Sequence, residues 1–190
     1  MARPQKFNEQ QVLSKAMIYF WRHGYSASSI QELLDEMGIS RGTLYNAIGD
    51  KDALFKRTLE LFHSKEEQLL ELTLFNDALS PGERAEKFIR LSFSEHGSLP
   101  TGCYLVNTLC EDDRVLGDVK EIVNHALQRM EDGFRSLFDA HFQDQTLART
   151  YAALMATQVR GSRIRQREGG DNKMLVNDLL CLLETLLKAH

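Results

Sequence analysis

The stretch GISRGTLYNAIGDKDALF, residues 38–55, places a short polar helix between two breaks in the helical pattern. Gly38 opens a turn, and Ser40 is a good N-cap for a helix of barely two turns. Gly49 ends that helix. Only Leu44 within it is suited to a buried core, so most of its surface is left for contacts outside the chain.

Helical patterns flank this stretch on both sides. Before it, an amphipathic helix over 8–23 is followed by a short helix that Ser29 and the Glu three residues later cap with a capping box. After it, Asp50 caps a long fourth helix that begins at Lys51. A helix, a glycine turn and a short polar helix in this order are typical of a DNA-binding helix-turn-helix, here at about residues 29–48.

Apolar residues recur at helical spacing through almost all of the 190 residues, without a run of period-two alternation. This pattern predicts an all-α fold. We expect an N-terminal helix-turn-helix domain over residues 6–66 and a C-terminal helical domain over residues 67–190. Residues 1–60 carry eight Lys and Arg against seven Asp and Glu, whereas the remainder carries 15 against 20. This distribution argues against coating of nucleic acid by bulk charge and favours a few phosphate contacts at one end.

The sequence also indicates a compartment. The first residues, MARPQKFNEQ, lack the apolar core of a secretion signal, and no apolar run is long enough to span a bilayer. The three cysteines form no C-x-x-C pair, so a reducing cytoplasm is expected. The six histidines form no H-x-x-x-H pair. We therefore expect neither a metal site nor a cofactor.

The composition of the short polar helix suits contact with DNA. Arginine binds guanine through two hydrogen bonds, asparagine reads adenine, and the threonine methyl suits the thymine methyl. A glycine lets the backbone approach DNA closely, and the starts of the second and fourth helices offer N–H groups and charge to phosphates. Taken singly, each residue also fits an ordinary exposed linking helix. The candidate DNA-binding residues are Ser28, Ser29, Ser40, Arg41, Gly42, Thr43, Tyr45, Asn46 and Lys51.

From about residue 11 to residue 55 the sequence resembles the N-terminal domain of TetR-family transcriptional regulators. The stretch HGYSASSIQELLDEMGISRGTLYNAIGDKDALF and the FW before it match the family pattern in order and spacing. The sequence departs from it at Ile48, where the family commonly has an aromatic, and at Asn46 or Ala47, where the family commonly has a His or a similar residue. The resemblance implies a sequence-specific DNA-binding regulator, most often a repressor that an effector releases.

The resemblance also implies a two-fold symmetric homodimer with one recognition helix per half-site. The C-terminal domain would then hold an effector pocket, and its last two helices would form the dimer interface. The final helix independently has an apolar surface broader than one core-facing stripe needs. Burial within the monomer is the alternative explanation. The leucines concerned are Leu175, Leu179, Leu182, Leu183, Leu186 and Leu187.

The segment LPTGCYLVNTLCEDD, residues 99–113, is a candidate sensing segment. Its Pro-Thr-Gly turn places Cys103 at or near a helix N-terminus, where the helix dipole lowers a thiol pKa. The Gly-Cys pair resembles a NemR-type branch of the family, in which a cysteine senses electrophiles or oxidants. Packing of a small apolar residue is the alternative. Cys110 is too distant along a continuous helix for an intrachain disulfide, and Cys181 is expected in the core.

Three classes of function therefore remain open. The leading one is an effector-controlled repressor acting on double-stranded operator DNA. A thiol enzyme with Cys103 as nucleophile would need a histidine base, for which His96 is near in sequence but no motif exists. A DNA-tethered adaptor is the third. Candidates to line an effector pocket are Phe88, Phe93, Tyr104, Asn107, Met130, Phe134, Tyr151 and Met155.

Overall fold

The computed structural model of the chain describes residues 8–94, 99–111, 117 and 119–189. All regular structure in these ranges is helical, which confirms the all-α prediction. His96 and the first two residues of the predicted N-terminal domain lie outside the described residues. The helices are α1 (Glu9–His23), α2 (Ile30–Met37), α3 (Arg41–Ala47), α4 (Lys51–Leu72), α5 (Pro81–Ser92), α6 (Tyr104–Thr108), α8 (Lys120–His141), α9 (Gln145–Arg167) and α10 (Asn172–Lys188).

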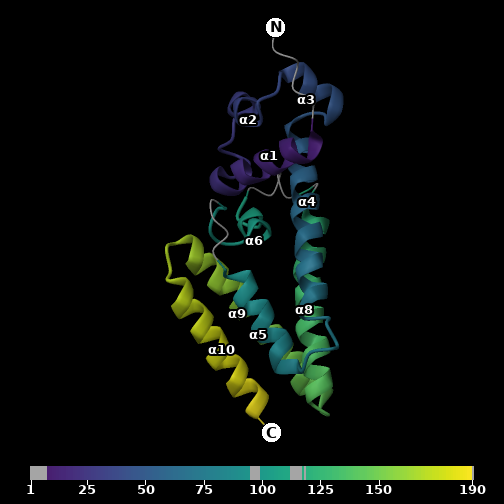
Figure 1. Cartoon of the computed structure of the whole chain (residues 1–190), viewed down its shortest axis with the longest axis vertical. Coiled ribbons are helices and arrows are strands. Elements are labelled where there is room, and N and C mark those ends of the chain that lie inside the picture. Colours follow the sequence, from purple (N-terminus) through teal and green to yellow (C-terminus); the bar gives the residue numbers. More distant parts are fainter. Residues whose placement is uncertain (1–7, 95–98, 112–116, 118, 190) are drawn as a thin grey trace.

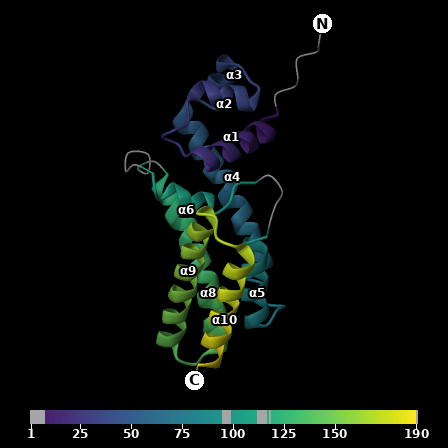
Figure 2. The ribbon, with the colours of Figure 1, turned by 90° about the vertical axis from the view of Figure 1, so that its left-hand side faces the viewer.

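The molecule is elongated, with α1, α2 and α3 gathered at one end and the C-terminal helices at the other (Figure 1). Helix α4 belongs to both parts, because it packs on α1 and then continues alongside α8. Helices α8 and α9 pack together, and α10 packs on α5 and α9 (Figure 2). A displacement of α4 against α8 therefore moves the N-terminal end relative to the rest.

The turns and caps of the N-terminal end follow the sequence prediction. Ser29, Ser40 and Asp50 each accept a hydrogen bond from the backbone N–H three residues on. The Glu32 carboxylate accepts the Ser29 N–H in return, which completes the capping box. Gly38 ends α2 with φ at 71°, in the left-handed region that glycine adopts without a steric cost.

Two clusters of buried apolar residues make the core. The first lies among α1 to α4 and includes the fully buried Leu44, as predicted. It continues into α6 through Tyr104, whose ring lies 6.1 Å from that of Trp21 and 5.7 Å from that of Phe62. The Tyr104 hydroxyl is 2.9 Å from Oγ1 of Thr58. Tyr104 thus joins the segment after Cys103 to the N-terminal end. The second cluster lies among the end of α4, α5 and α8 to α10.

Two predictions need correction. Helix α6 has only five residues and ends at Thr108, so Cys103 and Cys110 do not lie on one continuous helix. Cys181 is exposed, because α10 turns Leu179 and Leu183 inward and leaves the position between them outside. No described helix is long and apolar enough to cross a membrane.

Candidate nucleic-acid interface

Helix α3 presents a polar surface above a single apolar anchor. Leu44 is fully buried beneath it, and this anchor fixes which face of the helix turns outward. Arg41, Tyr45 and Asn46 are exposed, with Tyr45 at 52%. A phenol ring left this open on a two-turn helix has little packing role in the free chain. The three side chains are thus positioned to meet a partner outside the chain.

The start of α3 is compact and open to solvent. A Cβ atom added to Gly42 would meet only Oγ of Ser40, at 3.8 Å, so nothing within the protein requires a glycine there. Oγ of Ser40 accepts the Thr43 N–H and lies 2.9 Å from the Thr43 hydroxyl. Gly42 therefore leaves a flat surface at the helix start, as close approach of another molecule requires.

The two serines before α2 differ in position. Ser28 is buried; its hydroxyl donates to the Gly24 carbonyl at 2.5 Å and its N–H donates to Tyr25. Both groups that were expected to meet phosphate are thus used within the chain. Ser29 is exposed at the start of α2, and its hydroxyl is hydrogen-bonded to Glu32. These bonds hold the pKa of the Glu32 carboxyl below its ordinary value.

Lys51 is also engaged within the chain. Its Nζ donates to the Tyr25 carbonyl at 2.7 Å and lies 4.0 Å from the centre of the Tyr25 ring. Burial lowers the pKa of Lys51. The Tyr25 hydroxyl donates to Asp52, and burial together with this bond raises the pKa of Tyr25 to about 12. Lys51 therefore fixes the turn between α1 and α2, a role that the sequence prediction missed.

Glu111, which follows α6, fastens the rest of the chain to the same turn. Its carboxylate accepts the Tyr25 N–H at 2.7 Å and both the N–H and the hydroxyl of Ser26, at 3.3 and 2.9 Å. A Cβ atom on Gly24 would lie 2.5 Å from Oε1 of Glu111, and Gly24 has φ at 79°. Only glycine fits both conditions. No local pattern identifies Glu111, because its partners lie 85 and 86 residues away.

Comparison with known proteins agrees with this geometry. Residues 12–58 match the sequence model described as "Bacterial regulatory proteins, tetR family". The HTH-type transcriptional repressor ComR of Escherichia coli (strain K12) is 30% identical over 131 residues, which are 66% of this chain and 62% of ComR. The N-terminal part of the chain is thus similar to TetR-family regulators. The match spans less than two thirds of the length of ComR.

Solved TetR-family structures share the fold along nearly the whole chain. The regulator CifR, solved as a cysteine mutant complexed with 26bp double-strand operator DNA, has a TM-score of 0.83. It is 22% identical, and the match covers 96% of this chain and 98% of CifR. Reduced NemR of Escherichia coli has a TM-score of 0.77 at 16% identity, covering 93% of this chain and 94% of NemR. The predicted family resemblance is confirmed.

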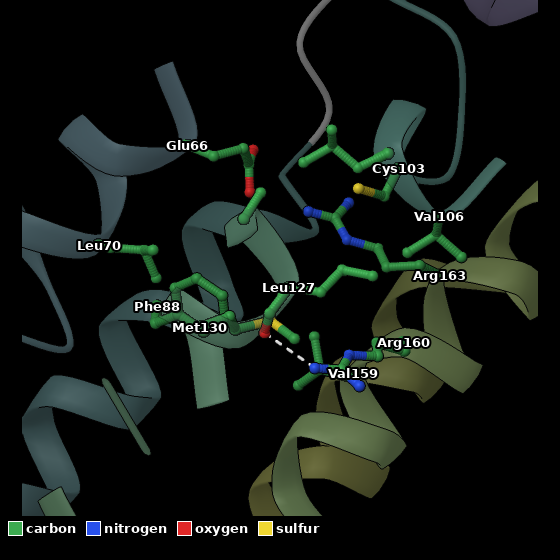
Figure 3. Close-up of a pocket in the computed structure, with 12 residues that line it drawn as sticks. Glu66, Leu70, Phe88, Cys103, Val106, Leu127, Met130, Val159, Arg160 and Arg163 are labelled. Atoms are coloured by element: carbon green, nitrogen blue, oxygen red, sulfur yellow. Dashed lines mark hydrogen bonds between the residues drawn. The ribbon is translucent and has the colours of Figure 1, made fainter. Parts of the chain in front are cut away.

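The surroundings of Cys103 differ from the prediction. Cys103 is the N-cap residue of α6, as expected, but its side chain is buried. Burial, followed by the nearby Glu66 carboxylate, raises the pKa of the thiol to about 11, and Arg163 offsets this only in part. The predicted lowering of this pKa is therefore wrong. Figure 3 shows the side chains of Cys103, Glu66 and Arg163 around a cavity. This cavity has a volume of about 30 Å³ and has room for roughly one water molecule.

A larger cavity, of about 560 Å³, lies between the N-terminal end and the C-terminal helices. None of the eight candidate pocket residues lines it; Phe88 and Met130 line the small cavity beside Cys103 instead. Two of its lining residues, Trp21 and Ser92, carry a buried Nε1 and a buried Oγ without a hydrogen-bond partner in the described structure. Its walls come from α1, α4, α5, residues 99–102, α9 and α10, so no single stretch of sequence reveals it.

Proposed function

We propose that the chain is an effector-released repressor that binds operator DNA as a homodimer. In this proposal residues 6–66 bind DNA, and residues 67–190 bind the effector and form the dimer interface. The observation that carries the proposal is the exposed polar face of α3, whose buried residue is Leu44. The TetR family consists of regulators rather than enzymes, and a thiol as weakly acidic as Cys103 is a poor nucleophile.

Helix α3 is the proposed recognition helix. Its exposed Arg41 and Asn46 supply the side chains that bind guanine and adenine in the major groove, and Tyr45 supplies a phenol for a base or a phosphate. Gly42 lets the backbone approach the duplex. Ser29, the exposed N-cap residue of α2, lies at a helix start that can face phosphate, and its hydroxyl and N–H would exchange Glu32 for the phosphate there. The structural neighbour CifR has been solved with operator DNA, which supports this use of the fold.

The proposed dimer interface lies on α9 and α10. On α9, Leu154 and Ile164 are 37% and 43% exposed, and on α10 Met174 is 62% exposed. Gly161 lies between the two exposed residues of α9, and a Cβ atom there would meet nothing within 4 Å. A partner helix can therefore approach α9 closely. Pairing of two chains brings two recognition helices to one operator, which gives the selectivity that one short helix lacks.

The cavity of about 560 Å³ is the proposed effector site, since its volume lies within the range of known ligand pockets. Trp21 Nε1 and Ser92 Oγ offer unpartnered polar atoms there; Lys65 and Arg163 add positive charge, and Glu66 adds one negative charge. We expect an effector with an apolar body and a carbonyl or carboxylate oxygen. Such an oxygen accepts hydrogen bonds that these buried donors lack in the free chain.

The route from this cavity to the DNA-binding end runs through α6. Gly102 donates its N–H to Oε1 of Gln166 at 3.2 Å, and both residues line the cavity. Cys103 and Tyr104 follow directly, and Glu111 after α6 holds the turn before α2. A ligand that changes the position of Gly102 therefore changes a segment attached to the helix-turn-helix. The size of the ligand's effect on DNA binding is set by the difference between its affinities for the two arrangements of this segment.

The first test measures binding to DNA from upstream of the chain's own gene against a scrambled duplex of equal length, at one salt concentration. We expect selective binding that Arg41→Ala or Tyr45→Ala weakens by about tenfold to a hundredfold. Arg90→Ala, which removes an exposed arginine from α5 and lies outside the proposed dimer helices, is the matched control and keeps full affinity. Equal, weak binding to every duplex tried would contradict sequence-specific recognition by α3.

The second test measures release from DNA by small carbonyl and carboxylate compounds. Ser92→Ala removes an unpartnered hydroxyl, so we expect unchanged folding and DNA affinity with a weaker response to the active compound. DNA affinity that stays constant with every metabolite and oxidant would favour the adaptor alternative.

A further inference from the structure

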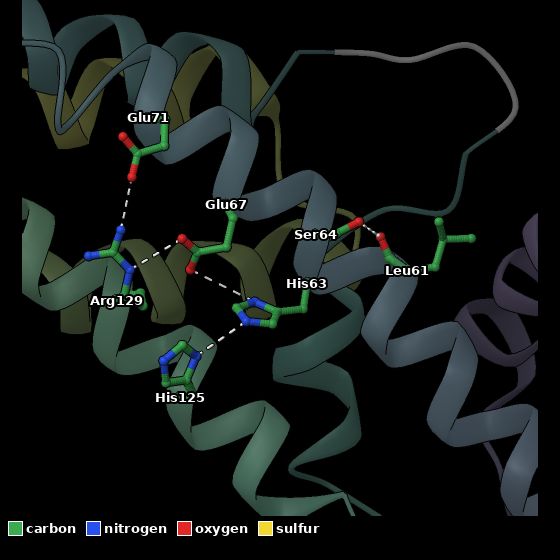
Figure 4. A network of polar contacts seen from close by, with 7 residues as sticks. All are labelled: Leu61, His63, Ser64, Glu67, Glu71, His125 and Arg129. Atoms are coloured by element: carbon green, nitrogen blue, oxygen red, sulfur yellow. Dashed lines mark hydrogen bonds and ion pairs between the residues drawn. The ribbon is translucent and has the colours of Figure 1, made fainter.

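The seam between α4 and α8 brings together two histidines that are 62 residues apart in sequence. His63 and Glu67 lie one turn apart on α4, and His125 faces them from α8 (Figure 4). No metal site was predicted from the sequence, because its histidines form no H-x-x-x-H pair. The spacing of His63 and Glu67 places two metal-ligating side chains on one helix face, and the third comes from the facing helix.

The distances suit a shared ion once His125 rotates. Nδ1 of His63 lies 4.0 Å from Oε1 of Glu67, whereas the other ring nitrogen of His63, Nε2, lies 3.2 Å from Nδ1 of His125. One ligand atom from each residue lies within 4.8 Å of the other two. Zinc bonds of about 2.0–2.2 Å in a tetrahedral site place ligand atoms roughly 3.4 Å apart. Small side-chain rotations, chiefly of the exposed His125, close the remaining difference.

Two of these ligand atoms lack hydrogen-bond partners in the described structure. His63 Nδ1 and Glu67 Oε1 are both buried, and neither has a hydrogen-bond partner. Buried polar atoms without partners cost free energy, so they are rare in folded proteins. A bound cation satisfies the carboxylate oxygen directly and an imidazole nitrogen with it.

Neighbouring residues orient the Glu67 carboxylate for binding a cation. Arg129 donates from Nε to Oε2 of Glu67 at 3.2 Å and from Nη2 to Glu71 at 3.0 Å. Its guanidinium also lies over the ring of Phe75, which fixes its position. Arg129 therefore orients Glu67 and leaves Oε1 for a ligand, as outer residues do around metal sites. Two carboxylates against one guanidinium leave a net negative charge for a cation.

We propose that His63, Glu67 and His125 bind one first-row divalent transition-metal ion, with water completing the coordination. Two imidazoles and one carboxylate suit Zn²⁺, Ni²⁺ or Cu²⁺, whereas Mg²⁺ and Ca²⁺ prefer sites made of oxygen alone. The ion connects α4 to α8 and stabilises their packing. This site is separate from the cavity of about 560 Å³, and its existence does not depend on DNA binding.

The test uses Zn²⁺ as the probe on the full chain with Cys110→Ser and Cys181→Ser, which remove the two exposed thiols. Equilibrium dialysis should give one ion per chain, and the same amount of Mg²⁺ should give none. A hundredfold excess of Zn²⁺ over its Kd should raise Tm by roughly 5–10 °C. His125→Ala, at an exposed position, should lower Zn²⁺ affinity at least tenfold and abolish most of the Tm shift.

Glu67→Gln keeps the size of the side chain and should also lower the affinity at least tenfold. His23→Ala removes a different exposed histidine, and Glu60→Gln removes an exposed carboxylate of α4 outside this cluster; both should retain one ion per chain. Saturable binding that is unchanged in both His125→Ala and Glu67→Gln would overturn the site. Absence of saturable Zn²⁺, Ni²⁺ and Cu²⁺ binding to the starting protein would overturn it as well.

Discussion

Two helix starts in this chain were predicted from the same kind of turn chemistry, and the structure gives them opposite surroundings. Ser40 begins α3 at the exposed end of the molecule, where its hydroxyl caps the helix and the residues after it face solvent. Cys103 begins α6 behind α4 and α9, beside Glu66 and Arg163. Local sequence thus locates a helix start, whereas residues distant in sequence determine the chemistry that occurs there.

The difference has a physical cause. Hydrogen bonds of a cap join residues three apart, so their geometry is set by the sequence itself. Burial and the Glu66 charge raise the pKa of the Cys103 thiol, and together they outweigh the lowering by Arg163 and by the backbone N–H groups of α6. A short helix of five residues adds little to this balance.

The largest expected effect separates the two faces of α3 at neighbouring positions. Leu44→Ala removes a fully buried side chain and should lower the free energy of unfolding by about 2–5 kcal/mol. Tyr45→Ala, one residue on, removes a side chain that is 52% exposed and should change it by less than about 0.5 kcal/mol. Urea unfolding of both variants measures the difference.

The same two variants should differ in DNA affinity in the opposite direction, with Tyr45→Ala the more strongly affected. At a temperature where both are folded, Tyr45→Ala should bind operator DNA more weakly than Leu44→Ala. Equal stability losses would show that the Tyr45 ring packs within the chain, and the assignment of the outward face would then be wrong.

The second effect concerns the contrast between the Cys103 thiol and an exposed one. With a pKa of about 11, Cys103 has a thiolate fraction at pH 8 of about one in a thousand, against roughly a quarter for an ordinary cysteine. Alkylation at pH 8 should therefore modify Cys103 at least about a hundredfold more slowly than the exposed Cys110. Mass spectrometry of timed samples measures both rates.

The rate at Cys103 should rise about tenfold per pH unit up to its pKa, because the thiolate is the reactive form. Modification of Cys103 as fast as that of Cys110 at pH 8 would contradict the burial seen in this structure. It would also restore the proposal that Cys103 senses electrophiles in the resting state.

The sequence predicted what depends on neighbouring residues. The capping box of Ser29, the turn at Gly38 and the burial of Leu44 follow from patterns a few residues long, and the structure confirms them. Lys51 was placed correctly at the start of α4, yet its partner is Tyr25, whose position depends on how α1, α2 and α4 pack. One-dimensional patterns do not carry that information.

The candidate sites in the rest of the chain were harder to predict for the same reason. Trp21 and Ser92 read as ordinary residues of two amphipathic helices, and only packing brings both to one cavity. His63 and His125 have no sequence relation, although Glu67 four residues after His63 was a signal that a search for paired histidines misses. Each site combines side chains from helices that the sequence separates widely.

The third prediction tests whether the segment that contains α6 is coupled to the helix-turn-helix that contains α3. Glu111→Ala removes the carboxylate that accepts hydrogen bonds from Tyr25 and Ser26. Loss of these charge-assisted bonds should lower the free energy of unfolding by about 1–3 kcal/mol and should also weaken DNA binding. Glu60→Ala, an exposed position on α4, is the control. Unchanged DNA affinity in a folded Glu111→Ala protein would show that this contact is structural only.

The smallest effect is the sharpest test of α3, because stability and DNA affinity should change in opposite directions. A Cβ atom on Gly42 meets only the Ser40 hydroxyl at an ordinary contact distance of 3.8 Å. Gly42→Ala should therefore raise the free energy of unfolding by about 0.5–1 kcal/mol, as alanine does within a helix. If DNA approaches the backbone here, the added methyl group meets the duplex and operator affinity falls. A variant that is more stable and binds operator with full affinity would show that the DNA approaches α3 from another side.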